Sequence, residues 1–98
     1  MPVIMTTLAT LKPDGDDALA RYAEIVIPLI DAAGGEVLCR SVFREGLVGE
    51  GFPNFVASIR FPNADDARML MRSEAYARAV VHRDAAFADL RTFIGDAV

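Results

Sequence analysis

Gly34–Phe61 reads GGEVLCRSVFREGLVGEGFPNFVASIRF, and this stretch decides the fold. Alternating side-chain character predicts one strand over Glu36–Leu47 and another over Phe55–Phe61. The segment between them, GLVGEGFPN, is rich in glycine and contains a proline, which is typical of a long hairpin connection. We therefore expect two neighbouring antiparallel strands around which the rest of the chain is arranged.

Each of these strands presents two faces, because successive side chains of a strand point in opposite directions. The later strand has one fully apolar face, which we expect the helices to cover: Phe55, Ala57, Ile59 and Phe61. Its opposite face carries Val56, Ser58 and Arg60. The earlier strand divides into Val37, Cys39, Ser41 and Phe43 against Leu38, Arg40, Val42 and Arg44. This alternation predicts that Arg40 and Arg60 lie on the same face of neighbouring strands.

The segments before the hairpin predict one strand and one helix. Pro2–Leu11 has apolar or small side chains on both faces, as in a central strand that is covered on both sides. Asp16 and Asp17 then open a helix whose apolar positions recur every three or four residues up to Gly34. Pro28 lies inside this helix and is expected to kink it.

The segments after the hairpin predict helices and a final strand. Asn63 is placed to cap one helix and Ser73 to cap a further short helix. The tail from Ala85 fits either helical spacing or a short strand over Leu90–Ile94. We favour the strand because it completes a βαββαβ order. The predicted fold is therefore α+β and ferredoxin-like, with a four-stranded antiparallel sheet and both helices on one face.

The chain of 98 residues forms a single domain over residues 1–98, and 53% of its residues are hydrophobic. The sheet face away from the helices would be too apolar to leave in water. It would carry Ile4, Leu8, Leu38, Val42 and Val56. A second copy packed on this face about a two-fold axis would cover it. We therefore predict a homodimer whose two sheets enclose a barrel-like space.

Charge and composition argue against several classes of protein. The net charge is −4 and the basic residues are dispersed, so a nucleic acid is not an expected partner. There is no basic leader and no apolar run of about 20 residues, so we expect neither a signal peptide nor contact with a membrane. The chain has one cysteine, Cys39, and one histidine, so neither a metal site nor a cofactor is predicted. The expectation is a soluble cytoplasmic protein.

Several segments resemble the DUF1330 family of the dimeric α+β barrel superfamily. They are PLIDAAGGEVLCR (Pro28–Arg40), IRFPNADDA (Ile59–Ala67) and SEAYARAVVHRDAA (Ser73–Ala86), together with Tyr22. The resemblance implies a ferredoxin-like subunit, a homodimer and a final strand. It implies no single activity, although the superfamily includes monooxygenases, isomerases and dechlorinating or decarboxylating enzymes. Arg60 stands where many members carry an acidic residue, which argues against carboxylate chemistry at that position.

Two residues are candidate catalytic groups. His82 is the only histidine and precedes Arg83 and Asp84, so it is a candidate general base near neutral pH. The alternative is an exposed residue at a helix end. Tyr76 is the second candidate base. The resemblance places Tyr76 and Arg83 at a pocket mouth, because an aromatic residue and an arginine recur in that helix of the family.

Other residues are candidate ligand-binding groups. Arg40, Arg60 and Ser58 could together hold a carboxylate or an enolate oxygen inside the barrel. The alternative is an ion-pair network of the two arginines with Glu45, Glu50 or a second subunit. Tyr22 lies on an apolar helix face, which indicates a core residue whose hydroxyl reaches a rim or a partner.

Three functions remain open on the sequence alone, because a fold does not define an activity. The first is a binding protein that holds a small apolar or anionic metabolite in the barrel cavity. The second is a cofactor-free enzyme that acts on a small enolisable or aromatic metabolite. The third is a structural dimer with a filled core. A void bordered by Arg40, Arg60 and Ser58 would favour binding or catalysis, whereas closure by Phe and Leu side chains would favour the structural dimer.

Overall fold

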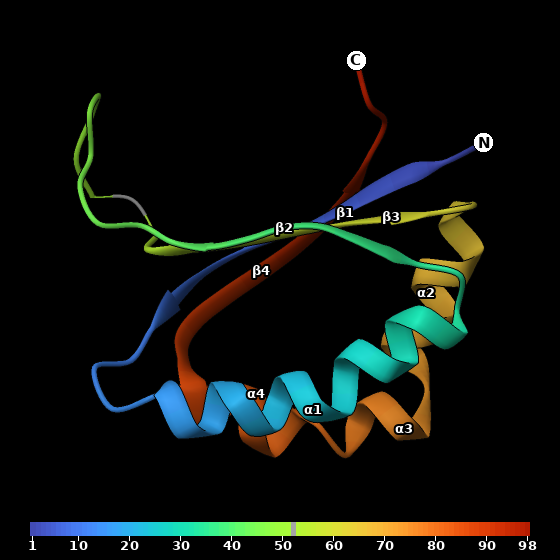
Figure 1. The fold of residues 1–98 in the computed structure, drawn as a ribbon, viewed down its shortest axis with the longest axis horizontal. Coiled ribbons are helices and arrows are strands. Elements are labelled where there is room, and N and C mark those ends of the chain that lie inside the picture. The colour runs from blue at the N-terminus through green and yellow to red at the C-terminus, as the bar shows by residue number, and fades with distance from the viewer. Residues whose placement is uncertain (52) are drawn as a thin grey trace.

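The computed structural model describes residues 1–51 and 53–98 and has the predicted α+β architecture. Over these residues, four antiparallel strands form one sheet in the order β2-β3-β1-β4, and the helices lie on one side of it (Figure 1). The elements are β1 (Val3–Leu11), α1 (Asp16–Ala32), β2 (Glu36–Val42), β3 (Phe55–Phe61), α2 (Ala64–Arg72), α3 (Glu74–Ala77), α4 (Val80–Ala86) and β4 (Phe87–Gly95). This is the ferredoxin-like βαββαβ order, with its second helical region divided into three short helices.

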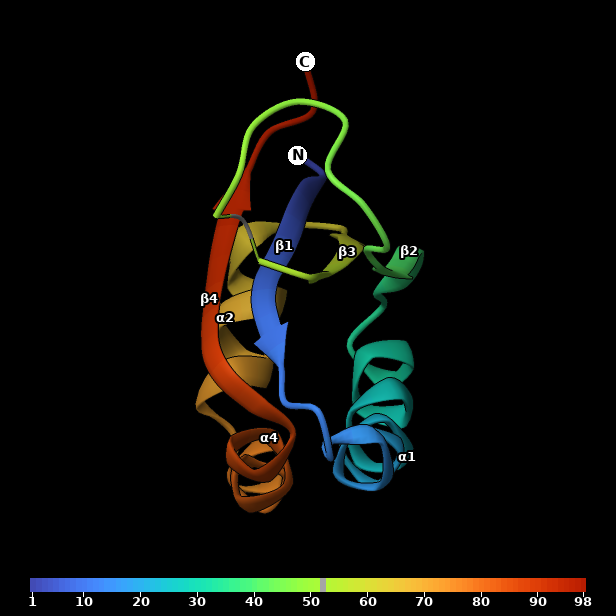
Figure 2. The same ribbon diagram turned by 90° about the vertical axis from the view of Figure 1, so that its left-hand side faces the viewer.

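The C-terminal segment is a strand, as predicted. β4 pairs antiparallel with β1 from Gly95 opposite Ile4 to Phe87 opposite Leu11. Figure 2 shows β4 running beside β1 across the sheet, with α4 directly before it in the helix layer. The tail therefore continues the sheet and does not extend α4.

The helix ends follow the capping signals of the sequence. The side-chain oxygen of Asn63 accepts a hydrogen bond from the backbone N–H of Asp66 at 3.0 Å. The hydroxyl of Ser73 accepts one from the N–H of Tyr76 at 3.0 Å, which fixes the first turn of α3. Gly34 ends α1 with a φ of 79°, a left-handed conformation that glycine adopts without strain. α1 continues through Pro28 as one helix.

β2 differs from its prediction in length and in the assignment of its faces. The strand ends at Val42 and not at Leu47. Its pairing with β3 shifts between Val37 and Cys39, so that Val37 lies opposite Ile59 while Arg40 lies opposite Ala57. Both partners belong to the apolar, helix-facing side of β3. The irregularity at Leu38 thus turns Arg40 towards the helices, and the predicted placement of Arg40 with Leu38 on the other face is wrong.

The hairpin between β2 and β3 extends beyond the sheet (Figure 1) and is tied down at its base by Asn54. The backbone carbonyl of Asn54 accepts a hydrogen bond from the Phe43 N–H at 2.7 Å, and the Asn54 N–H donates to the Ala9 carbonyl at 3.1 Å. The Asn54 side chain accepts from Leu11 N–H at 2.7 Å and donates to the Leu11 carbonyl at 3.4 Å. Phe52 belongs to the predicted loop but lies outside the described residues.

The helix-facing side of the sheet packs into two separate apolar clusters. The larger one joins Val3, Met5, Ile59 and Phe61 of the sheet to buried residues of the helices: Val26, Ile30, Ala67, Leu70, Tyr76 and Ala79. The smaller one contains Ala9, Phe55, Ala86 and Phe87. Between the two clusters lies the sheet level of Thr7 and Ala57, where the site described below is found.

The outer side of the sheet is not covered by the described part of the chain (Figure 1), and apolar side chains lie there among polar ones such as Ser58 and Arg60. Leu8 is 37% and Phe93 is 54% exposed on this side. Val42 was expected here, but it lies opposite Phe55 and so belongs to the helix-facing side. Among the described residues, no helix combines the length and the apolar character needed to cross a membrane.

Candidate functional site

A row of polar and small side chains crosses the helix-facing side of the sheet. Arg40 of β2 lies opposite Ala57 of β3, Ala57 lies opposite Thr7 of β1, and Thr7 lies opposite Thr92 of β4. Residues opposite one another share a face, so these four side chains form one line across all four strands. The hydroxyls of Thr7 and Thr92 are hydrogen-bonded at 2.8 Å. We call these four residues the polar row.

The polar row lies between two apolar rows of the same face. One of them is formed by Val37, Ile59, Met5 and Ile94, and the other by Val42, Phe55, Ala9 and Leu90. Ala57 is smaller than Phe55 and Ile59 of β3, and Thr92 is smaller than Leu90 and Ile94 of β4, so this side of the sheet is recessed at the level of the polar row. The two apolar clusters of the core are separated at the same place.

A cavity of about 60 Å³ lies between the polar row and the helices. Its lining includes all four residues of the row, together with Tyr22 and Tyr76 from the helix layer. Most of the remaining wall is apolar: Met5, Leu19, Ala23, Val26, Ile27, Ile30, Val37, Phe55, Ile59, Leu70, Met71, Phe87 and Leu90. A volume of this kind holds roughly four or five water-sized groups.

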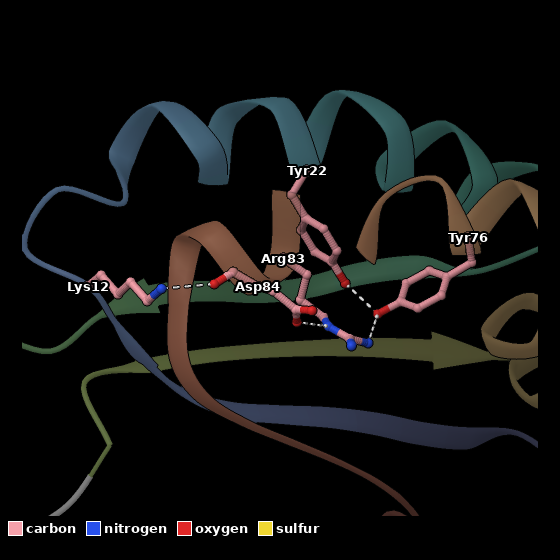
Figure 3. A network of polar contacts seen from close by, with 5 residues as sticks. All are labelled: Lys12, Tyr22, Tyr76, Arg83 and Asp84. Carbon is pink, nitrogen blue, oxygen red and sulfur yellow. Dashed lines mark hydrogen bonds and ion pairs between the residues drawn. The ribbon is translucent and has the colours of Figure 1, made fainter. Parts of the chain in front are cut away.

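The helix-layer wall of the cavity contains a chain of hydrogen bonds (Figure 3). The hydroxyls of Tyr22 on α1 and Tyr76 on α3 are 2.9 Å apart. Arg83 on α4 donates from Nη1 to the Tyr76 hydroxyl at 3.3 Å, and its guanidinium carbon lies 5.9 Å from the centre of the Tyr76 ring. The hydrogen bonds thereby join α1 to α3 and α4, which are distant from it in the sequence, above the cavity.

The chain of hydrogen bonds continues to the surface beyond Arg83. The Nε of Arg83 pairs with Oδ1 of Asp84 at 3.3 Å, and the Asp84 side chain is 67% exposed. Lys12 donates from Nζ to the backbone carbonyl of Asp84 at 3.0 Å. Arg83 also lines a surface depression with Asp84 and Asp89. The guanidinium therefore lies between the tyrosine pair and solvent.

The electrostatic surroundings keep the hydrogens of this chain in place. Burial, and secondly the hydrogen bond with Tyr76, raises the pKa of the Tyr22 phenol. Burial alone would lower the pKa of the Arg83 guanidinium, but the contacts with Tyr76 and Asp84 outweigh it and the pKa is raised. The Tyr22 phenol thus stays neutral and Arg83 is a permanent cation.

The structure brings some of the predicted site residues together and separates others. Tyr22, Tyr76 and Arg40 line one cavity, and Arg83 reaches it through the Tyr76 hydroxyl. Arg60 and Ser58 lie opposite Ile4 and Thr6, on the outer side of the sheet. The prediction that Arg40 and Arg60 share a face is therefore wrong, because it assumed an uninterrupted register in β2.

His82 is placed apart from this arrangement. It lies on α4 and is half-buried, but the residues found around the cavity, over the described part of the chain, do not include it. The sequence analysis also missed Thr7, Thr92 and Ala57. The only indication in the sequence was Thr7 among the inward-facing residues of the first strand. Threonine is frequent in strands because of its β-branched shape, so its presence there does not indicate a site. Within residues 1–51 and 53–98 no group of three or more His, Cys, Asp or Glu could hold a metal ion.

Comparisons with known proteins agree with the fold. The model of the family described as domain of unknown function (DUF1330) matches residues 7–96. A comparison with curated proteins gives no match. Among solved structures, the protein of unknown function RPA0582 from Rhodopseudomonas palustris is 27% identical, with a TM-score of 0.84, over 99% of this chain and 82% of that one.

Two further structures are similar in fold at low identity. A protein from Jannaschia sp. CCS1 is 9% identical with a TM-score of 0.79, over 99% of this chain and 100% of that one. A protein from Bacteroides fragilis NCTC 9343 is 15% identical with a TM-score of 0.66, over 98% of this chain and 96% of that one. Both are described as dimeric and ferredoxin-like, with unknown function. Since the family model spans nearly the whole length, this chain belongs to the DUF1330 family.

Proposed function

We propose that the protein binds a small organic anion with a short apolar body in the cavity between the sheet and the helices. The polar row supports this function, because it places Arg40 and two threonines where the core of such a sheet is otherwise apolar. Arg40 stands at the exposed edge of this level and also lines the cavity, so its charge is available to a ligand that enters from solvent. This cavity lies between the helices and the sheet of one subunit, whereas the space between two sheets that the sequence predicts would form only in the dimer.

Arg40 is the group suited to the charge of the ligand. It lies on the edge strand β2, lines the cavity and is exposed, so a bound carboxylate would keep part of its hydration. Complete burial of a carboxylate would cost far more free energy than one arginine returns. The apolar part of the ligand would then extend into the cavity between Ala57, Ile59 and Tyr22. The cavity volume favours a short chain over an aromatic metabolite.

We also propose that the protein is a homodimer, formed through the outer side of the sheet. Leu8 and Phe93 are exposed there, on the face that bears no helix. Burying the apolar surface on this side would stabilise the dimer by roughly 25 cal/mol for each Å² removed from water. The described structures from Jannaschia and Bacteroides are dimeric, which supports the same assembly for this chain.

Titration with pentanoate, a short carboxylate without other polar groups, tests the binding function. We expect the methyl NMR signals of Val26, Ile30 and Ile59 to shift, because these residues surround the cavity. Arg40→Met should weaken binding about ten- to a hundredfold, the value of a charge-assisted hydrogen bond. Arg60→Met is the matched control, since it removes the same charge from the outer side. Equal binding by wild type and Arg40→Met would disprove the role of Arg40, and unshifted cavity methyls would disprove the function.

A further inference from the structure

The hydrogen-bond chain above the cavity has a fixed direction at one end. A guanidinium has donors only, so Arg83 can act only as donor to the Tyr76 oxygen at 3.3 Å. That bond uses one acceptor position of the Tyr76 hydroxyl and none of its hydrogen. The direction of this one bond is therefore fixed by a residue that does not itself line the cavity, whereas either hydroxyl can donate in the bond between Tyr22 and Tyr76.

Counting hydrogens shows what the tyrosine pair offers to a ligand. The two phenols have two hydroxyl hydrogens, and one of them makes the bond between Tyr22 and Tyr76. The second hydrogen stays on Tyr22 or on Tyr76, whichever acts as acceptor in that bond. Both residues line the cavity, and Tyr76 is only 3% exposed. One phenolic donor is thus available to an acceptor inside the cavity.

The acceptor that suits this donor is a neutral oxygen. Burial already raises the pKa of the Tyr22 phenol, which shows that this end of the cavity disfavours a negative charge. The charged groups near the Tyr22–Tyr76 pair are Arg83 and its exposed partner Asp84. Arg40 of the edge strand β2 lines the same cavity. From β1 and β4 only the hydroxyls of Thr7 and Thr92 face the pair, and they are bonded to each other. A ketone oxygen can accept from a phenol without the cost of burying an anion.

We propose that the cavity recognises a short oxo acid, with its carboxylate at Arg40 and its ketone oxygen at the Tyr22–Tyr76 pair. This proposal rests on the proposed function and adds the substrate class to it. The volume of about 60 Å³ accommodates the body of such an acid, which has about four or five non-hydrogen atoms besides the carboxylate oxygens. Arg83 strengthens the tyrosine donor by polarising the Tyr76 hydroxyl, as a cation does in a chain of hydrogen bonds.

Three probes of nearly the same length separate the two ends of the ligand. Levulinate (4-oxopentanoate) has both groups, pentanoate lacks the ketone, and 2-pentanone lacks the carboxylate. We expect wild-type protein to bind levulinate about three- to tenfold more tightly than pentanoate, the value of one hydrogen bond between neutral groups. Titration followed by the cavity methyl signals measures both affinities.

The decisive variant is the double substitution Tyr22→Phe/Tyr76→Phe, which should make levulinate and pentanoate bind equally. Each single variant should retain part of the preference, because each leaves one phenolic hydrogen. The double variant keeps the shapes of both side chains, so it is expected to fold, and the methyl spectrum checks this. Thr6→Val/Ser58→Ala is the matched control, since it removes two hydroxyls from opposed positions on the outer side. This control should retain the full preference.

The outcomes separate this proposal from the one on which it rests. Binding of pentanoate without any preference for levulinate would overturn the oxo-acid assignment and leave the proposed function in place. A preference that persists in the double tyrosine variant, or that is lost instead in Thr7→Val/Thr92→Val, would overturn the role of the tyrosines. Failure of both carboxylates to bind would overturn both proposals.

Discussion

Each side of the sheet carries some side chains whose polarity does not match their surroundings, and the mismatch is opposite on the two sides. Beneath the helices, where apolar side chains are expected, Arg40, Thr7 and Thr92 cross the sheet in one row. On the outer side, where water would be the neighbour of a single subunit, Leu8 and Phe93 are exposed. The inner side is thus apolar with one polar level, and the outer side is polar with exposed apolar residues.

This difference shows how a small domain can indicate its contacts. Polar groups in a core cost free energy unless they are paired, and apolar groups in water cost free energy unless they are covered. Natural sequences break such local rules mainly where function requires it. We relate the polar level of the inner side to the proposed ligand and the exposed apolar residues of the outer side to the proposed homodimer, and the two proposals can be tested separately.

The largest effect is expected from placing a charge on the outer side. Leu8→Asp puts a carboxylate opposite Arg91 of β4, so the single subunit can pair it and remain folded. In the proposed homodimer this pair would be buried, which should weaken association by about 3 kcal/mol, more than a hundredfold in Kd. Native mass spectrometry should therefore find monomer.

Val81→Asp is the control for this experiment, because Val81 is an exposed apolar residue on the helix side of the molecule. It should leave the dimer intact. If Leu8→Asp remains dimeric at the same concentration, the outer side of the sheet is not the interface.

A smaller effect is expected from filling the inner cavity. Ala57 lies in the polar row and borders the cavity, so Ala57→Val should be accommodated, with stability unchanged or raised by about 1 kcal/mol. The same change at Ala67, which is fully buried between α2 and the sheet, should cost about 1–3 kcal/mol through overpacking. Urea unfolding measures both changes.

Binding of pentanoate is a second measurement that distinguishes the same two variants. Ala57→Val should abolish pentanoate binding, because the added methyl groups occupy the cavity, whereas Ala67→Val should reduce stability and leave binding intact. Equal destabilisation by both substitutions would mean that the sheet has no spare space at the polar row.

The smallest effect concerns pH. The folded state raises the pKa of Tyr22 above its unfolded value of about 10, so this tyrosine affects stability only where the unfolded chain ionises. Its stabilising contribution is complete below about pH 10 and is lost as the pH rises towards the folded pKa. The loss is about 1.4 kcal/mol per pH unit for one proton.

Comparison with Tyr22→Phe isolates this contribution from those of the other titrating groups. Urea unfolding between about pH 9 and 11.5 should show a less steep loss of stability in the variant. Identical slopes for the two proteins would show that Tyr22 ionises as readily in the folded state as in the unfolded chain.

Much of the fold could be predicted because local patterns and the global architecture agree. The caps at Asn63 and Ser73 were predicted from residue type, and the completed βαββαβ order identified β4 as a strand. The face of Phe55, Ala57, Ile59 and Phe61 was assigned correctly because its alternation is unbroken. Here several independent signals favoured one structure.

The candidate site could be predicted only in part, because it depends on register. Val37, Leu38 and Cys39 are all apolar enough for either face, so nothing in their hydropathy shows that the pairing shifts between them. Arg40 was therefore placed on the wrong side and matched with Arg60. Tyr22 and Tyr76 were both named, but their contact joins residues 54 positions apart, which no local pattern reveals.

The hydrogen bonds of Asn54 affect how well the hairpin loop tolerates insertions. The side-chain amide of Asn54 exchanges two hydrogen bonds with the backbone of Leu11, as one more peptide group of β3 would do. The hydrogen bonds at Asn54 therefore hold the end of the hairpin connection to β1. We infer that the length of the segment from Gly46 to Gly51 has little influence on strand pairing. Because longer loops add only slowly to the entropy of closure, this is where insertions can accumulate among descendants of the same ancestor without disturbing the ligand cavity.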